Sequence, residues 1–242
     1  MSTEPATAPK PTIVLVHGAF ADSSSWNGVV EPLRAQGYSV VAAANPLRGL
    51  DSDAAYVAAV VDGIEGPCVL VGHSYGGSVI TVAAAAQDTV TALVYIAAFI
   101  PAEGESALEL TDRFPGSTLG PTTRPGEYPL PDGSFGTELT IRQEEFHGQF
   151  AADVSAATAA LMAVTQRPVA LDALRQPATA AAWRTVPPYA LLTTEDRNIP
   201  IEAQRFMAER AAAHSVEVPA SHAVGVSAPD AVVDLIVLAA QK

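Results

Sequence analysis

Three residues of this chain have the types and the order that nucleophilic catalysis requires. They are Ser74, within the pattern Gly72-His73-Ser74-Tyr75-Gly76, then Asp196 and finally His222. A serine hydroxyl becomes a good nucleophile only when a base takes its proton, and a carboxylate must orient that base. The residues therefore predict Ser74 as the nucleophile, His222 as the base and Asp196 as the acid.

The sequence around Ser74 predicts a sharp turn between a strand and a helix. An apolar run from Cys68 to Val71 ends at Gly72, and a helical pattern of small residues follows from Ser78 to Ala86. This order is the context of a nucleophile elbow, in which glycines prevent collisions where the strand and the helix meet. The N-terminus of the helix favours negative charge near the serine. The alternative interpretation is a glycine-rich turn without chemistry.

The predicted acid and base each follow a predicted strand. Asp196 comes after the run Tyr189 to Thr193, and His222 comes after the run Ser215 to Val218. In a hydrolase sheet, loops at the carboxyl ends of later strands carry the acid and then the base, in this chain order. We therefore expect both side chains to reach the elbow.

Other residues compete for these two roles. Glu195 adjoins Asp196, while Glu103 and Glu105 lie beyond the fourth predicted strand, where an acid could also be held. We favour Asp196 because it opens a loop, Asp196-Arg197-Asn198-Ile199-Pro200, in front of a helix. We interpret the other histidines as structural or solvated: His17, His73, His147 and His214. For His147, which lies in the predicted cap, a place in the pocket lining stays open.

Acyl transfer also needs two backbone N–H groups directed at the developing oxyanion. Tyr75, the residue after the nucleophile, is expected to supply one of them. Ala19, in the loop after the first strand, is expected to supply the other. Phe20 and Trp26 could form pocket walls, but they suit a hydrophobic core equally well.

Strands alternate with helices at both ends of the chain, which predicts an α/β fold with a parallel sheet and helices on both faces. The predicted strands are 12–16, 39–43, 68–71, 92–97, 189–193 and 215–218. The predicted helices of this core are 25–36, 52–62, 78–86, 201–212 and 229–240.

The alternation stops between about residues 101 and 185. A hairpin is predicted there from 128–130 and 134–141, around Pro131-Asp132-Gly133, followed by helices over 142–150 and 154–166. A long insertion between two core strands is typical of a cap over an active site. Because both ends of this cap insertion join the same sheet, we predict a single domain over 1–242.

Composition limits the classes of partner. Asp and Glu number 26 against 13 Lys and Arg, for a formal net charge of −13, which argues against nucleic acid and anionic membranes as partners. The single cysteine, Cys68, excludes an internal disulfide. Met1 to Pro9 is polar and Pro-rich, unlike a signal peptide, and no apolar run is long enough to span a bilayer. We expect a cytoplasmic protein.

Four motifs together resemble the α/β-hydrolase superfamily, and within it the branch of plant methyl esterases, hydroxynitrile lyases and their bacterial esterase relatives. The motifs are His17-Gly18-Ala19-Phe20, Gly72-His73-Ser74-Tyr75-Gly76-Gly77, Thr194-Glu195-Asp196-Arg197 with Pro200, and Ser221-His222 with Ser227 and Pro229. The resemblance covers about residues 12–240, although the cap matches only in position and size. It implies the α/β-hydrolase fold, with a mostly parallel six-stranded core sheet.

The resemblance also implies a function and a set of site residues. Ser74, Asp196 and His222 would form the triad, Ala19 and Tyr75 the oxyanion hole, and no cofactor or metal would be needed. Some lyases of this branch place a lysine directly after the catalytic histidine, whereas this chain has Ala223 and no lysine between Pro11 and Gln241. This difference favours a serine hydrolase acting on a small carboxylic ester.

Several alternatives to ester hydrolysis stay open. A carbon–carbon bond lyase similar to the hydroxynitrile lyases, or a perhydrolase, could use the same triad. A ligand receptor that turns substrate over slowly is the non-enzymatic alternative. A homodimer also remains open, and the sequence does not identify the natural ester.

Overall fold

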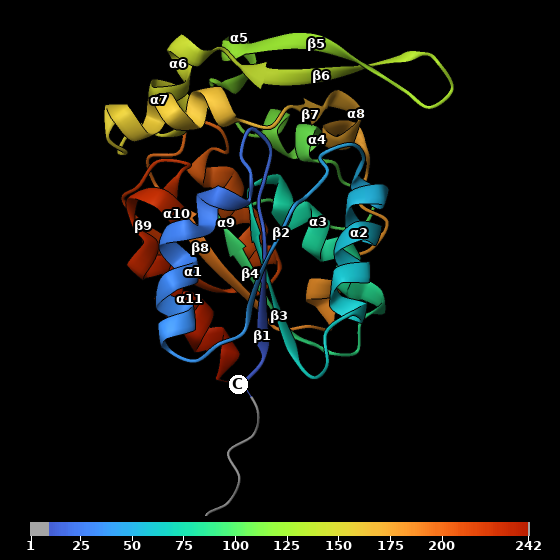
Figure 1. Ribbon diagram of the computed structural model, residues 1–242, viewed down its shortest axis with the longest axis vertical. Helices are drawn as coiled ribbons and strands as arrows, with labels where there is room; N and C mark the ends of the chain where they lie inside the picture. The colour runs from blue at the N-terminus through green and yellow to red at the C-terminus, as the bar shows by residue number, and fades with distance from the viewer. Residues whose placement is uncertain (1–9, 242) are drawn as a thin grey trace, which may run out of the picture.

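A six-stranded β-sheet runs through the centre of the molecule (Figure 1). The computed structural model describes residues 10–241, so the expectation for Met1 to Pro9 lies outside the described residues. The sheet order is β2-β1-β3-β4-β8-β9, and every neighbouring pair is parallel. The strands are β1 (Thr12–Val16), β2 (Val40–Ala43), β3 (Cys68–His73), β4 (Val90–Ile96), β8 (Pro188–Thr193) and β9 (His214–Val218). The predicted fold class is confirmed.

The central strands form because their sequences are apolar on both faces. β1 reads Thr-Ile-Val-Leu-Val, β3 reads Cys-Val-Leu-Val-Gly-His, and every residue of β3 is buried. Aliphatic and β-branched side chains pack well in a strand that is covered from both sides. The two strands pair in register from Thr12 and Cys68 to Val16 and Gly72. This register places the loop after β1 beside the turn after β3.

Helices cover both faces of this sheet (Figure 1). On one face α1 and α11 bury apolar side chains against the strands, and on the other face α2, α3 and α9 do the same. The bounds are α1 (Asn27–Ala35), α2 (Leu50–Asp62), α3 (Tyr75–Ala83), α9 (Ile201–Arg210), α10 (Val224–Ser227) and α11 (Pro229–Ala240), with 3₁₀ turns at Ser23–Trp26, Ala84–Ala86 and Ala182–Arg184. The helix after the elbow begins at Tyr75, three residues earlier than its predicted start at Ser78.

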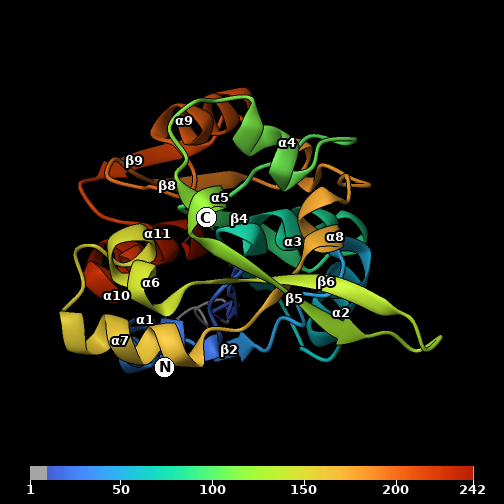
Figure 2. The ribbon, with the colours of Figure 1, turned by 90° about the horizontal axis from the view of Figure 1, so that it is seen from above.

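The segment between β4 and β8, here called the cap, lies over the carboxyl ends of the core strands (Figure 1). Seen from above, its helices and its hairpin spread across that end of the sheet (Figure 2). It contains a second, three-stranded sheet of order β5-β6-β7. Its elements are α4 (Ala107–Asp112), α5 (Leu119–Thr122), β5 (Thr123–Pro129), β6 (Phe135–Ile141), α6 (Gln143–Phe150), α7 (Ala156–Thr165), β7 (Val169–Ala170) and α8 (Leu171–Arg175).

The predicted hairpin of the cap is present, but its first strand is longer than expected. β5 begins at Thr123, which pairs with Ile141, rather than at Tyr128. Pro125 lacks an N–H, and it is tolerated because β5 is an edge strand whose outer side has no partner. The polar and Pro-rich composition of β5 therefore concealed its strand character.

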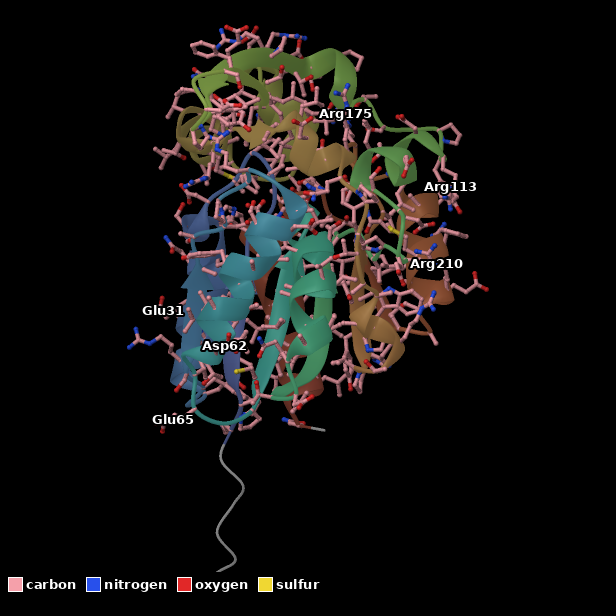
Figure 3. The ribbon with its side chains drawn as sticks, turned by 90° about the vertical axis from the view of Figure 1, so that its right-hand side faces the viewer. Glu31, Asp62, Glu65, Arg113, Arg175 and Arg210 are labelled. Carbon is pink, nitrogen blue, oxygen red and sulfur yellow. The ribbon has the colours of Figure 1, made fainter. Side chains whose placement is uncertain are left out.

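Side-chain contacts tie the cap to the core helices. Ser106 and Glu109 form a capping box that starts α4, in which each side chain bonds to the backbone N–H of the other residue. Glu105 accepts hydrogen bonds from Arg113 at 3.2 Å and from Arg210 of α9 at 2.8 Å, and both arginines lie on the same side of the molecule (Figure 3).

Among the described residues there is no helix long and apolar enough to cross a membrane.

Candidate active site

The turn after β3 holds Ser74 in an unusual backbone conformation, with φ 55° and ψ −124°. A positive φ is uncommon for a residue with a side chain, and such strain clusters at functional sites. Two glycines make the turn possible. A Cβ on Gly76 would lie 2.4 Å from the carbonyl oxygen of Val16, and a Cβ on Gly72 would lie 2.5 Å from the carbonyl oxygen of Gly76. Strand, turn and helix therefore meet too closely for any larger residue.

Gly18 brings the loop after β1 against this serine. A Cβ on Gly18 would lie 2.6 Å from Cβ of Ser74 and 3.2 Å from its Oγ, so only glycine permits the approach. The next residue, Ala19, lines the same cavity as Ser74 and Tyr75. Within residues 10–241, neither the N–H of Ala19 nor that of Tyr75 has a hydrogen-bond partner. Both amides are thus available beside the serine.

His222 and Asp196 form a buried hydrogen-bonded pair. The distance from Nδ1 of His222 to Oδ2 of Asp196 is 2.7 Å, and their side chains are 1% and 0% exposed. The other contacts of the carboxylate are all donors: the hydroxyl of Thr193 (3.0 Å), Nε2 of Gln204 (3.1 Å) and the backbone N–H groups of Asn198 (2.7 Å) and Ile199 (3.0 Å). A buried carboxylate needs such donors because it can only accept.

The alternative acids lie elsewhere. Glu195 and Glu103 are exposed. Glu105 bonds to two arginines, Arg113 and Arg210. Partial burial acts to raise the pKa of its carboxyl, but hydrogen bonds from Arg210 and the N–H of Ala102, together with the charges of both arginines, hold that pKa below its usual range. Of the four carboxylates considered from the sequence, Asp196 is the one that the fold brings to His222.

Three of the other histidines lie within hydrogen-bonding distance of backbone carbonyl oxygens. Nε2 of His73 lies 2.8 Å from the carbonyl oxygen of His222, and burial lowers the pKa of His73 to about 3. The neutral ring therefore donates to the backbone carbonyl group of His222. Nδ1 of His17 lies 3.0 Å from the carbonyl oxygen of Gly18, and burial lowers the pKa of His17 as well. His147 bonds to the carbonyl oxygen of Val154 and lies outside the cavity lining, and His214 is exposed at the start of β9.

Ser74, Tyr75, Ala19 and His222 face one cavity of about 380 Å³ beneath the cap. Most of its remaining wall is apolar and comes from the cap: Phe99, Leu108, Phe114, Leu119, Leu139, Leu171 and Leu174, with Phe20 from the core. Of the two aromatic residues that were ambiguous from the sequence, Phe20 lines this cavity, whereas Trp26 is buried in the cluster beneath α1 and α11. Four residues of α4 line the wall and were not predicted from the sequence: Ala107, Leu108, Thr111 and Asp112.

The cap also contacts the loop that carries His222. The carboxylate of Asp153 accepts from the backbone N–H of Ser221 at 3.0 Å and contacts the hydroxyl of the same serine. The ring of Phe150 packs edge-on against the ring of His222, with 4.9 Å between centroids. His222 is therefore contacted by the core through Asp196 and by the cap through Phe150.

Among residues 10–241, no three His, Cys, Asp or Glu side chains gather in a way that could hold a metal ion. The polar groups around the cavity fit acyl-transfer chemistry: a serine on a strained turn, a histidine paired with a carboxylate, and two unpaired amides. Nδ1 of the buried His222 ring is occupied by Asp196.

Comparisons with known proteins identify the family of this chain. A model of the alpha/beta hydrolase family matches residues 13–235. No curated protein sequence matches the chain significantly. The chain belongs to the alpha/beta hydrolase family, as the motifs of the sequence predicted.

Solved structures with the same fold include three enzymes of different names. Polyneuridine aldehyde esterase aligns with a TM-score of 0.82 and 20% identity, over 95% of this chain and 98% of that one. A pyrethroid hydrolase from Sphingobium faniae JZ-2 aligns with a TM-score of 0.75 and 23% identity, over 96% and 97%. Tomato methylketone synthase I, complexed with 2-tridecanone, aligns with a TM-score of 0.80 and 18% identity, over 97% and 99%. At these identities the likeness shows the fold.

Proposed function

We propose that this protein hydrolyses carboxylic esters through a Ser74–His222–Asp196 triad, without a cofactor. The observation that carries the proposal is the buried 2.7 Å hydrogen bond between His222 and Asp196, at a cavity that Ser74 also lines. Membership of the alpha/beta hydrolase family supports it. The names of two structural neighbours, an esterase and a hydrolase, point the same way.

The reaction begins with a proton transfer. His222 takes the proton of the Ser74 hydroxyl, and Oγ attacks the ester carbonyl to give a tetrahedral oxyanion. The amides of Ala19 and Tyr75 stabilise this oxyanion, and the N-terminus of α3 adds a favourable dipole. His222 then gives its proton to the leaving alcohol, which departs and leaves an acyl-enzyme. A water molecule, deprotonated by His222, attacks this acyl group and releases the acid and the free serine.

The cavity wall indicates the kind of ester. Leucine and phenylalanine side chains dominate it, and apolar walls favour an uncharged acyl or alcohol group through the hydrophobic effect. Asp112, at the exposed rim, adds a negative charge that disfavours an anionic substrate. We propose a small neutral ester with a hydrophobic group as the substrate class.

The experiment that tests the proposal is Ser74→Ala against a panel of p-nitrophenyl esters of graded acyl length. We expect kcat to fall by about 10⁶-fold when the nucleophile is removed. Ser78→Ala is a matched control, because Ser78 is also a buried serine of the elbow region but lies one turn into α3. A fluorophosphonate probe should label wild type and Ser78→Ala at Ser74 and leave Ser74→Ala unlabelled. Labelling at another residue would overturn the assignment.

The same panel separates turnover from slow binding. A steady release of p-nitrophenol supports an esterase, in which His222 activates water for deacylation. A single burst of product without further turnover would instead favour the slow ligand receptor.

A further inference from the structure

The proposed mechanism leaves a buried carboxylate without a role. Asp53, in the first turn of α2, is 0% exposed. Its Oδ2 accepts from the hydroxyl of Tyr75 at 2.9 Å, and its Oδ1 accepts from the backbone N–H of Arg48 at 3.1 Å. Burial raises the pKa of Asp53 and also that of Tyr75. A buried carboxylate is costly to keep, so a chain that keeps one gains something from its geometry.

Tyr75 connects this carboxylate to the reaction site. It is the first residue of α3, its side chain is 1% exposed, and its N–H is unpaired at the cavity. One residue thus has its backbone beside Ser74 and its hydroxyl anchored on a different helix. The bond to Asp53 therefore restrains the residue whose N–H lies at the cavity.

The anchor is also connected to the cap. The Arg48 guanidinium bonds to Glu138 of β6 at 2.7 Å and lies over the ring of Tyr128 of β5, 4.3 Å from its centroid. The N–H of Ala170 in β7 donates to the carbonyl oxygen of Leu47 at 2.9 Å. The loop that contains Leu47 and Arg48 therefore supplies a donor to Asp53 and also contacts the three-stranded sheet of the cap.

We propose that Asp53 is a positioning residue for the oxyanion hole: through the Tyr75 hydroxyl it holds the Tyr75 N–H where the oxyanion forms, and through Arg48 it links that position to the seating of the cap. This inference rests on the proposed ester hydrolysis. A displaced donor loses transition-state stabilisation while substrate binding is little affected, because the oxyanion exists only after attack.

The test compares Tyr75→Phe, Asp53→Asn and the double variant with wild type on a neutral p-nitrophenyl ester. Tyr95→Phe is the matched control, since Tyr95 is also 1% exposed and its hydroxyl bonds to Thr81 of α3 at 2.9 Å, away from the cavity lining. We expect Tyr75→Phe to lower kcat by about tenfold or more, since small misplacements of catalytic groups have large effects, with KM nearly unchanged. The inhibition constant of phenylboronic acid, which forms a tetrahedral adduct with the serine, should rise in parallel.

Non-additivity distinguishes positioning from a general loss of packing. If Asp53 acts through the Tyr75 hydroxyl, the double variant should lose about as much kcat as the more damaging single variant. The inference would be overturned if the kcat losses of the two single variants multiply in the double variant, or if Tyr75→Phe behaves like Tyr95→Phe. If Asp53→Asn does not fold, the comparison of Tyr75→Phe with Tyr95→Phe still decides it. Absence of ester turnover in wild type would instead reject the proposed function, so the two failures are distinguishable.

Discussion

At the scale of single residues, orientation of the histidine is the main contribution of the fold to the proposed chemistry. Asp196 occupies Nδ1 of His222, so the other ring nitrogen, Nε2, is the one left to exchange a proton with the serine. His73 adds a second constraint, because its ring bonds to the backbone carbonyl oxygen of His222. The ring of His222 is therefore held by Asp196, and its backbone is held by His73.

This orientation predicts unequal effects for two neighbouring acids. Asp196→Asn should reduce kcat by about 10⁴-fold, because an amide that donates to Nδ1 selects the wrong tautomer of His222. Glu195→Gln, at an exposed position one residue earlier, should change kcat little. Both are checked as kcat at one pH with the same ester. Equal, modest losses for the two variants would mean that another group orients the histidine.

The residue after the base bears on the reaction class. Ala223 is buried and apolar, so no cation adjoins His222 at that position to stabilise a departing cyanide. We expect the protein to hydrolyse a small aryl or methyl ester and to release no cyanide from mandelonitrile above background. Assaying both compounds with one preparation checks this, with Ser74→Ala as the control for each. Cyanide release faster than ester cleavage would establish a lyase in place of a hydrolase.

At the scale of elements, the close approach of β1, β3 and α3 makes the elbow sensitive to volume. Gly76→Ala places a Cβ 2.4 Å from the carbonyl oxygen of Val16, so the backbone must move. We expect a loss of at least about 3 kcal/mol in the free energy of unfolding. Gly63→Ala is the control, since a Cβ there makes only ordinary contacts at 3.5 Å and beyond. Urea denaturation measures both, and equal stabilities would contradict the proposed crowding.

The core elements were predictable because their sequences repeat one physical pattern. β1 and β3 are apolar runs that end in glycine-containing loops, so their type and order could be read directly. Since parallel strands place their carboxyl ends together, the neighbourhood of Ser74, Asp196 and His222 also followed from the sequence. The sequence favoured Asp196 over its three rivals because it opens a loop in front of a helix, and in the fold Asp196 is the one that bonds to His222.

The cap was less predictable because its elements are short and exposed. β5 contains Arg124, Pro125 and Gly126, which carry no strand signal, and it exists through pairing with β6. α4 could have been found, since Ser106 followed by Glu109 is a capping-box signature. Asp53 had no such signal, because an acidic residue in the first turn of a helix is normally solvated.

At the scale of the whole molecule, the cap is joined to the core on both sides of the cavity. Arg48 and Glu138 form one link at 2.7 Å. On the other side, Asp153 bonds to the N–H of Ser221 at 3.0 Å, and Arg197 donates to the carbonyl oxygen of Gly148 at 2.9 Å. Two of these contacts fall in the loops that carry Asp196 and His222. The packing of the cap and the positions of Asp196 and His222 therefore depend on the same contacts.

Burial of neutral histidines makes the stability of the whole molecule depend on pH. The pKa of His73 is lowered to about 3 and that of His17 is lowered as well, in both cases chiefly by burial. The unfolded chain binds protons at these rings near pH 6.5, whereas the folded chain does not. The free energy of unfolding should therefore fall as the pH drops below about 6.5, by up to about 1.4 kcal/mol per pH unit for each ring, until the folded ring also protonates.

Urea denaturation of wild type and His73→Gln between about pH 8 and about pH 5 measures this dependence. The free energy of unfolding of the variant should fall less steeply with decreasing pH, by up to about 1.4 kcal/mol per pH unit, because glutamine does not titrate. The glutamine amide can still donate to the carbonyl oxygen of His222. The raised pKa of Asp53 acts in the opposite sense, and it cancels when the two proteins are compared. His214→Gln, at an exposed histidine, is the matched control and should decline like wild type. If His73→Gln also declines like wild type, the His73 ring is protonated in the folded protein, and it cannot be the neutral donor that supports the backbone of His222.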